Sequence, residues 1–264
     1  MNTGSNTLLL GVTGVGKTYS IRTFLDAGIT PFVITTEPGI ESTLGDTNPN
    51  DLHWHYIAPS AEGWDSLIDV GQKINTLSYD ALAKMSGMNK QMYSGYMDFL
   101  NTCQNFTCDR TGESFGDVTE WGPDRALVVD SLSGLNILAM DLVVGNKPTK
   151  AMQDWMVAQN NLEKLITKLT TGTRCYFVLT AHLEREQDEV TGAIQLTAST
   201  LGKKLAPKIT RFFDDVVQVK REGTRFTWST AAGNVDVKAR NLAINDNLPP
   251  SFKPIVDTRA AMNG

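Results

Sequence analysis

The stretch Gly11-Val12-Thr13-Gly14-Val15-Gly16-Lys17-Thr18 decides how the rest of this chain is interpreted. It satisfies every fixed position of the phosphate-binding pattern G-x-x-x-x-G-K-[ST]. Glycines let the backbone curl so that successive N–H groups point inward at phosphate oxygens. In this pattern Lys17 reaches the β- and γ-phosphates, and the Thr18 hydroxyl coordinates Mg²⁺. All eight residues are therefore candidates for binding a nucleoside triphosphate.

The residues on either side of this loop support the same interpretation. Leu8-Leu9-Leu10 indicates a short buried strand that leads into the loop, and residues 18–25 indicate a helix that leaves it. Gly28 is expected to end that helix. The N-terminus of a helix carries a partial positive charge, which favours a bound anion. An ordinary glycine-rich turn does not require this strand-loop-helix context, so ATP and Mg²⁺ are the expected ligands.

The composition is that of a globular protein with one large domain. The chain has 264 residues, of which 41% are hydrophobic and 20% charged. We expect a single domain over 1–264, with an insertion at about 75–122, where Met, Asn, Gly and Ser occur without clear periodicity. No apolar run approaches the roughly 18 residues of a membrane span, and residues 1–6 lack signal-peptide features. Together with only three cysteines, these features predict a cytoplasmic protein without a membrane partner.

The charge balance bears on nucleic acid as a partner. The chain carries 24 basic and 29 acidic residues, giving a formal net charge of −5. Proteins that bind nucleic acid as isolated monomers usually have a basic balance. Binding of nucleic acid would therefore need a local basic surface, and an oligomer would present several copies of that surface.

Later segments predict a mainly parallel sheet flanked by helices. Residues 31–36, 126–130 and 175–180 are short apolar runs rich in β-branched side chains, which indicate strands. Apolar side chains recur at helical spacing over 151–170 and predict a helix there. Shorter signals predict a strand at 52–57, a helix at 61–74, and C-terminal antiparallel strands at 215–220, 225–229 and 235–240. The predicted fold class is α/β.

Three polar side chains stand at the carboxyl ends of predicted strands or just after them. In open α/β sheets ligands bind at the carboxyl ends of the strands, so Glu37, Asp130 and His182 should gather near the loop. Asp130 is then a candidate Mg²⁺ ligand, Glu37 a candidate for activating water, and His182 a candidate hydrogen-bond partner of the γ-phosphate. Each also has an ordinary interpretation. Asp130 could cap a helix, Glu37 could be a solvated turn residue before Pro-Gly, and His182 could be purely structural.

Several blocks in order resemble the core of RecA-fold ATPases. These blocks are LLLGVTGVGKT, FVITTEPG, RALVVDSLSGL, CYFVLTAH and VDVKARNL. The chain looks most like the small phage-encoded members related to RecA and RadA, the Sak-type single-strand annealing recombinases. The resemblance covers most of the chain in scattered blocks and fails over about 75–122.

This resemblance implies a role for each matching residue. It implies that Glu37 is the catalytic glutamate, Asp130 the metal aspartate and His182 the γ-phosphate sensor. It implies that Lys238 and Arg240 complete the site of a neighbouring subunit in trans, and that the polar stretch after His182 is a DNA-binding loop. It also implies a homo-oligomer, either ring or filament, with a phage single-strand binding or replication protein as a further partner. RecA-type recombinases carry an N-terminal docking segment, whereas this chain begins just before its loop, so another subunit contact is expected.

A basic cluster is the candidate contact to single-stranded DNA. Lys203, Lys204, Lys208 and Arg211 follow the polar stretch, and the last three would share one face of a helix. Such a cluster could hold a phosphate backbone, although a solvated helix surface is the commoner meaning of a charge run.

The cysteines give little support for a metal site. Cys103 and Cys108 lie near each other in sequence, and Cys175 falls in a predicted buried strand. A structural zinc site normally needs four ligands, which this pattern does not supply, so whether Cys103 and Cys108 bind metal stays open.

Two functions from different classes follow from these features. The first is a Mg²⁺-dependent ATPase that acts as an oligomer on single-stranded DNA in phage recombination or replication. The alternative is a nucleotide-driven switch or assembly factor that acts on a protein partner without DNA. Stimulation of ATP hydrolysis by single-stranded DNA would separate them.

Overall fold

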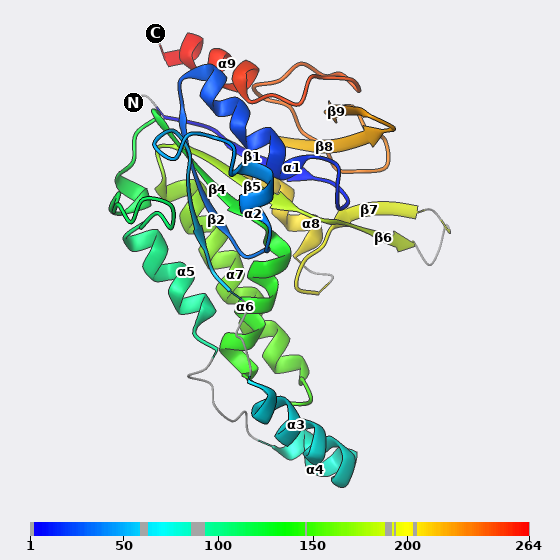
Figure 1. Ribbon diagram of the computed structural model, residues 1–264. Helices are drawn as coiled ribbons and strands as arrows, with labels where there is room; N and C mark the ends of the chain where they lie inside the picture. The colour runs from blue at the N-terminus through cyan, green and yellow to red at the C-terminus, as the bar shows by residue number, and fades with distance from the viewer. Residues whose placement is uncertain are drawn as a thin grey trace.

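The computed structural model contains a seven-stranded sheet in the order β3-β2-β4-β5-β1-β8-β9 (Figure 1). The structure describes residues 3–58, 63–85, 93–145, 147–187, 192, 194–202 and 205–263. Six strands are parallel, and only β9 pairs antiparallel, with β8. The strands are β1 (Asn6–Leu10), β2 (Thr30–Thr35), β3 (His53–Tyr56), β4 (Arg125–Asp130), β5 (Tyr176–Ala181), β8 (Asp215–Glu222) and β9 (Arg225–Ser229). The predicted α/β class is confirmed.

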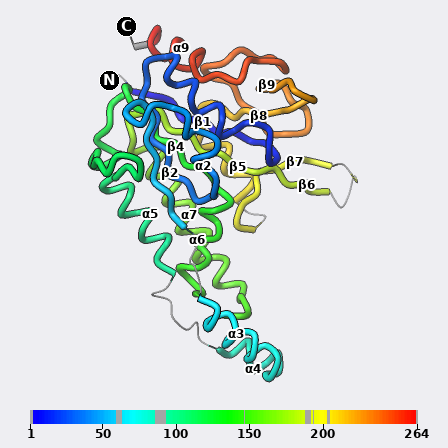
Figure 2. Tube along the Cα trace, viewed as in Figure 1, coloured from blue at the N-terminus to red at the C-terminus, as the bar shows by residue number. Residues whose placement is uncertain are grey.

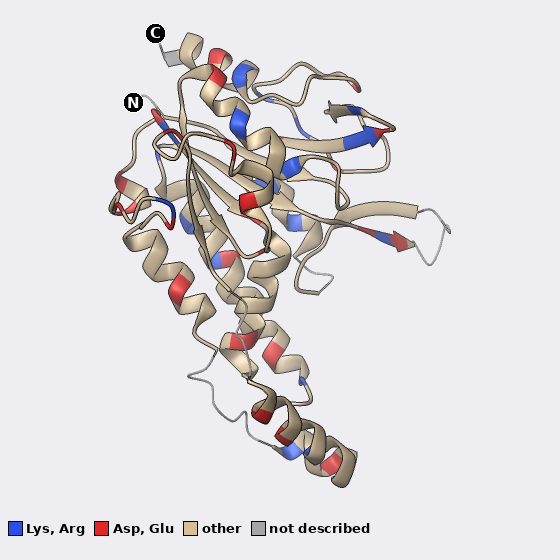
Figure 3. Ribbon diagram, viewed as in Figure 1, with Lys and Arg blue, Asp and Glu red and all other residues tan. Residues whose placement is uncertain are grey.

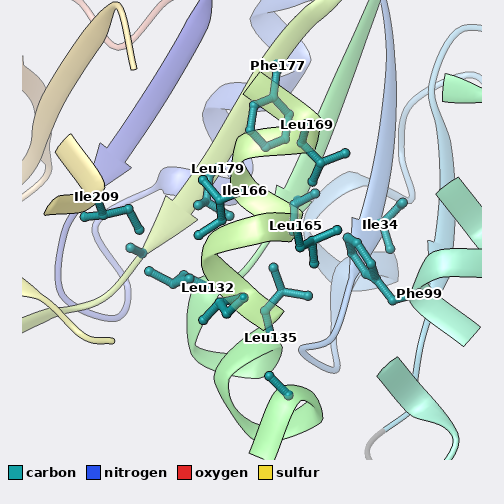
Figure 4. Packing of buried hydrophobic residues seen from close by; sticks show 14 of the residues in the cluster. Ile34, Phe99, Leu132, Leu135, Leu165, Ile166, Leu169, Phe177, Leu179 and Ile209 are labelled. Carbon is teal, nitrogen blue, oxygen red and sulfur yellow. The ribbon is translucent and has the colours of Figure 1, made fainter. Parts of the chain in front are cut away.

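Helices cover both faces of this sheet. Successive strand residues point to opposite faces, so Leu8 and Leu10 join one hydrophobic cluster while Leu9 joins another. The first cluster is the larger and contains side chains of α5 (Gly95–Gln104), α6 (Leu132–Val144) and α7 (Met152–Gly172). Figure 4 shows these side chains packed against the strands. The second cluster contains side chains of the 3-10 helix η1 (Ile21–Ala27), α2 (Ile40–Leu44) and α9 (Lys253–Asn263).

The strand register brings the key loops to one edge of the sheet. Leu10 pairs with Ala181, and Thr35 pairs with Asp130. Because these strands are parallel, the residues that follow each of them leave from the same edge. The opposite edge holds the start of β8, since Asp215 pairs with Thr7.

The helix after the glycine-rich loop is α-helical only in its first part. It begins as α1 (Lys17–Ser20) and continues as the 3-10 helix η1 to Ala27, so the helical stretch covers the predicted residues 18–25. Gly28 ends it with φ 72°, a left-handed conformation that glycine adopts without steric cost, as expected.

The connection between β3 and β4 contains the segment predicted as an insertion. It begins with α3 (Trp64–Thr76) and α4 (Tyr79–Lys84), which extend away from the sheet (Figure 1). Helix α3 buries none of its side chains, and Trp64 is 81% exposed. The later part of the connection is buried instead. Phe106 and Trp121 belong to the first hydrophobic cluster, as does Val118 of the short 3-10 helix η3 (Val118–Glu120).

The C-terminal third adds two hairpins and closes the fold. Strands β8 and β9 form the predicted hairpin on the main sheet, and β6 (Leu183–Gln187) pairs with β7 (Ile194–Ala198) in a separate ribbon. Between them lie α8 (Ala206–Ile209) and the 3-10 helix η4 (Thr210–Phe212). The expected strand at 235–240 is limited to two isolated bridges, at Val235 and Lys238. The two ends of the chain lie together (Figure 2), where Arg259 donates to the carbonyls of Thr3 and Gly4.

Candidate functional site

The glycine-rich loop follows β1 in the conformation that phosphate binding requires. Gly14 and Gly16 have φ values of 78° and 92°, which a residue with a side chain adopts only with strain. Lys17 is buried, and its ammonium donates to the carbonyls of Gly11 at 2.8 Å and Val12 at 3.0 Å. Burial lowers the pKa of Lys17, and the carboxylates of Asp130 and Glu37 oppose that shift. The loop therefore holds its cation close to two anions.

Asp130 ends β4 and meets the loop directly. Thr18 Oγ1 donates to Asp130 Oδ2 at 2.7 Å, and the Thr180 hydroxyl of β5 donates to Oδ1. Asp130 is buried, and this burial raises the pKa of its carboxyl against the opposing effect of the two hydroxyl donors. A hydroxyl and a carboxylate are hard oxygen ligands of the kind that Mg²⁺ prefers. The two predicted metal ligands are thus adjacent, and both fit the ion.

Glu37 stands two residues past Thr35, the last residue of β2 that pairs with β4, and contacts the predicted sensor. His182 Nε2 lies 3.0 Å from Glu37 Oε1, and the Ser131 hydroxyl donates to the same carboxylate oxygen. The hydrogen bond from His182 is the main cause that lowers the pKa of Glu37 to about 2, while partial burial opposes it and Ser131 and Lys17 add to it. Glu37 is therefore ionised throughout the neutral range.

The low pKa limits what Glu37 can do in a reaction. A carboxylate with a pKa of about 2 is a weak proton acceptor, because general bases work best with a pKa near the operating pH. It remains a strong hydrogen-bond acceptor. Glu37 in this arrangement is suited to orienting a water molecule rather than to holding its proton.

A cavity of about 760 Å³ joins these groups. This size suits a nucleotide, since ligand pockets typically occupy about 300–1,000 Å³. One set of lining residues is the loop and the three strand-end side chains. The remaining lining residues include Tyr19, Ser20, Thr23, Thr43, Phe226 and Pro250.

Comparison with known proteins agrees with this geometry. A family model described as an AAA domain matches residues 3–242. The chain belongs to this family of P-loop ATPases. A search of curated proteins found no match. Nucleotide binding and hydrolysis are the activities of P-loop ATPases, which generally use ATP and Mg²⁺, and Thr18 and Asp130 are the residues of this AAA-domain protein that would hold the metal.

Lys238 and Arg240 lie away from the P-loop of their own chain. Lys238 pairs with Val216 near the start of β8, and its ammonium donates to the carbonyl of Phe213 at 2.5 Å. Arg240 Nη1 bonds Asp214 Oδ1 at 2.8 Å, although the side chain is 63% exposed. This is the edge of the sheet opposite to the P-loop. Within one AAA-domain chain, neither cation reaches the site.

The predicted DNA-contacting residues are only partly described. Lys203 and Lys204 lie outside the described residues. Lys208 and Arg211 are exposed, but they fall on the four-residue α8 and on the 3-10 helix η4 rather than on one continuous helix. Lys208 Nζ also lies 3.8 Å from Glu163 Oε2. Lys and Arg are spread over several elements of the AAA-domain protein (Figure 3).

The structure brings to the site residues that the sequence analysis did not select. The β8–β9 hairpin places Phe226 against Gly16 and Arg221 near Gly14, whose carbonyl accepts from Nη1 at 3.4 Å. Nothing in the local sequence connects these residues with a loop more than 200 positions earlier. Ser131 and Thr180 were also missed, although each is adjacent or nearly adjacent to a predicted site residue.

The described residues offer no further metal site. In the described ranges no group of three or more His, Cys, Asp or Glu side chains is arranged to hold a metal ion. Cys103 and Cys108 are free thiols, and burial raises the pKa of Cys103 to about 12.

Membrane-spanning helices are also absent from the part of the chain that the structure describes. None of the described helices is both long enough and apolar enough to span a bilayer.

Proposed function

We propose that this AAA-domain protein is a Mg²⁺-dependent ATPase in which Glu37 orients the attacking water. The observation that carries the proposal is the pair of contacts at the mouth of the P-loop, Glu37 with His182 and Thr18 with Asp130. They bring the ends of β2, β4 and β5 to one phosphate-binding loop. Phosphoryl transfer needs an oriented nucleophile and neutralised charge, and these groups supply both.

The roles follow from the chemistry of each side chain. The P-loop N–H groups and Lys17 bind phosphate oxygens, and Thr18 and Asp130 hold Mg²⁺, which neutralises charge on the phosphates when bound. Glu37 accepts a hydrogen bond from water and directs its oxygen toward the γ-phosphorus. His182, whose Nε2 lies 3.0 Å from Glu37 Oε1, is proposed to sense the terminal phosphate through a change in this contact.

The site is proposed to be completed in trans by Lys238 and Arg240 of another copy. Support comes from their position, since both lie at the far edge of the sheet in their own chain and Arg240 remains largely exposed. An arginine suits stabilisation of the charge that spreads over a transferring phosphoryl group. This arrangement requires a homo-oligomer, as a ring or a filament.

Mixing two inactive variants tests action in trans. Lys17→Ala is expected to lose nucleotide binding, and Arg240→Ala is expected to bind ATP normally but to lower kcat at least about 1,000-fold, as for other trans arginines. In mixed oligomers the Lys17→Ala chain supplies Arg240 to the intact P-loop of the other chain. Phosphate release should therefore recover in the mixture. Arg174→Ala, a change of an exposed arginine outside the site and outside the candidate DNA contact, is the matched control. A mixture as inactive as its parts would contradict the proposal.

Single-stranded DNA is the proposed partner that the sequence resemblance suggests. The expected result is that single-stranded DNA raises the rate of ATP hydrolysis several-fold, with a steep fall in DNA affinity as salt increases. Phosphate release is measured with and without the DNA, and sizing is performed with an ATP analogue. Hydrolysis that occurs without DNA and ignores its addition would exclude this partner while leaving the ATPase assignment intact.

One observation favours the alternative of a switch that acts on a protein. His182 leads directly into the β6–β7 ribbon, and its carbonyl accepts from the N–H of Ser199, whose hydroxyl bonds Glu184 at 2.5 Å. The described part of β6 carries Glu184, Arg185 and Glu186, an excess of negative charge that does not favour a phosphate backbone. A nucleotide-dependent change at His182 would thus be transmitted to the β6–β7 ribbon. The charge of this ribbon suits a protein partner better than it suits DNA.

A further inference from the structure

We infer that Phe226 and Tyr19 form a stacking site for the base of a purine nucleoside triphosphate, without side-chain readout of the base edge. This inference rests on the proposed function, because it concerns the same cavity. It assigns the part of the cavity that the phosphate chemistry does not use.

The strand order fixes the orientation of a nucleotide in the cavity. Asp130 ends β4 and His182 follows β5, and both strands lie on one side of β1 in the sheet. Phe226 comes from β9, which lies on the other side of β1 beyond β8. A triphosphate whose terminal phosphate faces Glu37 and His182 therefore points its base toward the β8–β9 hairpin.

The lining on that side is aromatic and apolar. The ring of Phe226 lies against Gly16, where an added Cβ would come within 3.1 Å of it. Phe226 is 38% exposed and Tyr19 is 57% exposed, although both line the cavity. Pro250 also lines the cavity, and it is anchored near η1 because the N–H of Phe252 donates to Thr23 Oγ1 at 3.0 Å. Exposed aromatic faces at the mouth of a cavity are suited to stacking on a base.

Arginines hold both rings in place. The guanidinium of Arg22 lies 4.0 Å from the centre of the Tyr19 ring, and Arg22 is itself bound to Asp46 at 2.8 Å. The guanidinium of Arg221 lies 5.2 Å from the Phe226 ring centre. These cation–π contacts leave the rings oriented before a ligand arrives, which reduces the entropy lost on binding.

Three of the hydroxyls that line this cavity already donate their protons to backbone carbonyls. Ser20 donates to the carbonyl of Lys17, Thr23 to that of Ser20, and Thr43 to that of Gly39. Adenine and guanine differ mainly in the donors and acceptors on their edges. These three hydroxyls therefore offer a base edge only acceptor lone pairs, which either purine can meet with its exocyclic amino group, so stacking area decides affinity.

Calorimetric titration with four probes tests the inference, each in the presence of Mg²⁺: ATP, GTP, CTP and inorganic tripolyphosphate. The wild-type protein should bind ATP and GTP within about threefold of each other, and CTP more weakly, because stacking tolerates any base but scales with its area. Tripolyphosphate, which has no base, should bind at least about tenfold more weakly than ATP.

Variants separate stacking from a structural role. Phe226→Ala should weaken ATP about tenfold or more and leave tripolyphosphate unchanged, and Phe226→Leu should lie between because it keeps bulk without a π-face. Tyr19→Ala should act in the same direction, whereas Ile244→Ala, an exposed apolar residue outside the cavity lining, should change neither.

The outcomes distinguish this inference from the proposed function. Equal loss of ATP and tripolyphosphate in Phe226→Ala, or no loss of ATP in either aromatic variant, overturns the stacking site while the P-loop assignment stands. A more than about tenfold preference for one purine overturns the absence of edge readout. Failure of the wild-type protein to bind either ATP or tripolyphosphate overturns the proposed function and the stacking site together.

Discussion

Replacing Glu37 by glutamine is expected to lower kcat for ATP hydrolysis about 100-fold or more while leaving the Kd for ATP within about threefold. Glutamine keeps the length of the side chain and can still accept the hydrogen bond from His182. Its neutral carbonyl attracts a water proton less strongly than the carboxylate does. Because Glu37 is proposed to act on the water rather than on the nucleotide, the loss should appear in kcat. Steady-state phosphate release and ATP titration measure the two quantities separately.

Glu41→Gln provides the matched control for this variant. Glu41 is exposed in the first turn of α2, four residues beyond Glu37, and it should tolerate the same substitution without a change in kcat. A Glu37→Gln enzyme that retains more than about a tenth of wild-type kcat would place water activation elsewhere.

The pH dependence of stability gives an independent check on Glu37. Its pKa is lowered from 4.5 to about 2 in the folded protein, chiefly by the hydrogen bond from His182. A carboxyl with a lowered pKa contributes stability that is present above its unfolded-state pKa and is lost as the pH falls through the folded value. The difference in free energy of unfolding between the wild type and Glu37→Gln should therefore shrink from about pH 4.5 toward pH 2.

The residues at the strand ends could be predicted because the carboxyl ends of parallel strands lie at the same edge of a sheet. A short apolar run that ends in a polar residue indicates both the strand and the edge to which that residue belongs. Three such runs and the glycine-rich loop predict that Glu37, Asp130 and His182 gather at one edge, where the structure places the Glu37–His182 and Thr18–Asp130 contacts. The same reasoning says nothing about side chains that arrive from the surface of a hairpin, such as Phe226.

Other elements differ from the sequence prediction for identifiable reasons. Residues 235–240 alternate like a strand, but the buried carboxylate of Asp215 accepts the backbone N–H groups of Arg240 and Asn241, and this contact holds the segment outside a regular ladder. Helix α3 has the periodicity of a core helix, yet its side chains are not buried. Periodicity shows that one face is apolar and does not show what covers it.

Replacing Asp130 by asparagine is expected to raise the melting temperature of the nucleotide-free protein and to lower kcat about 100-fold or more. The two effects have one cause. Burial raises the pKa of Asp130, so the folded protein holds a carboxylate in surroundings that disfavour its charge. A raised pKa means that the ionised group opposes folding above that pKa, and a neutral isostere removes the opposition. Asparagine can still pair with the Thr18 and Thr180 hydroxyls, because its amide both accepts and donates.

The expected change in stability can be checked by thermal unfolding, in which the melting temperatures of the wild type and D130N are compared with and without Mg²⁺ and ATP. Ligand binding to the folded state stabilises the wild type according to ligand concentration and Kd, whereas the D130N variant should gain little because its metal ligand is neutral. The order of melting temperatures should therefore reverse when Mg²⁺ and ATP are added. Asp124→Asn, an exposed change just before the opposite end of β4, should shift neither temperature. If D130N melts below the wild type without nucleotide, the ionised carboxylate stabilises the fold and the expected gain in stability is wrong.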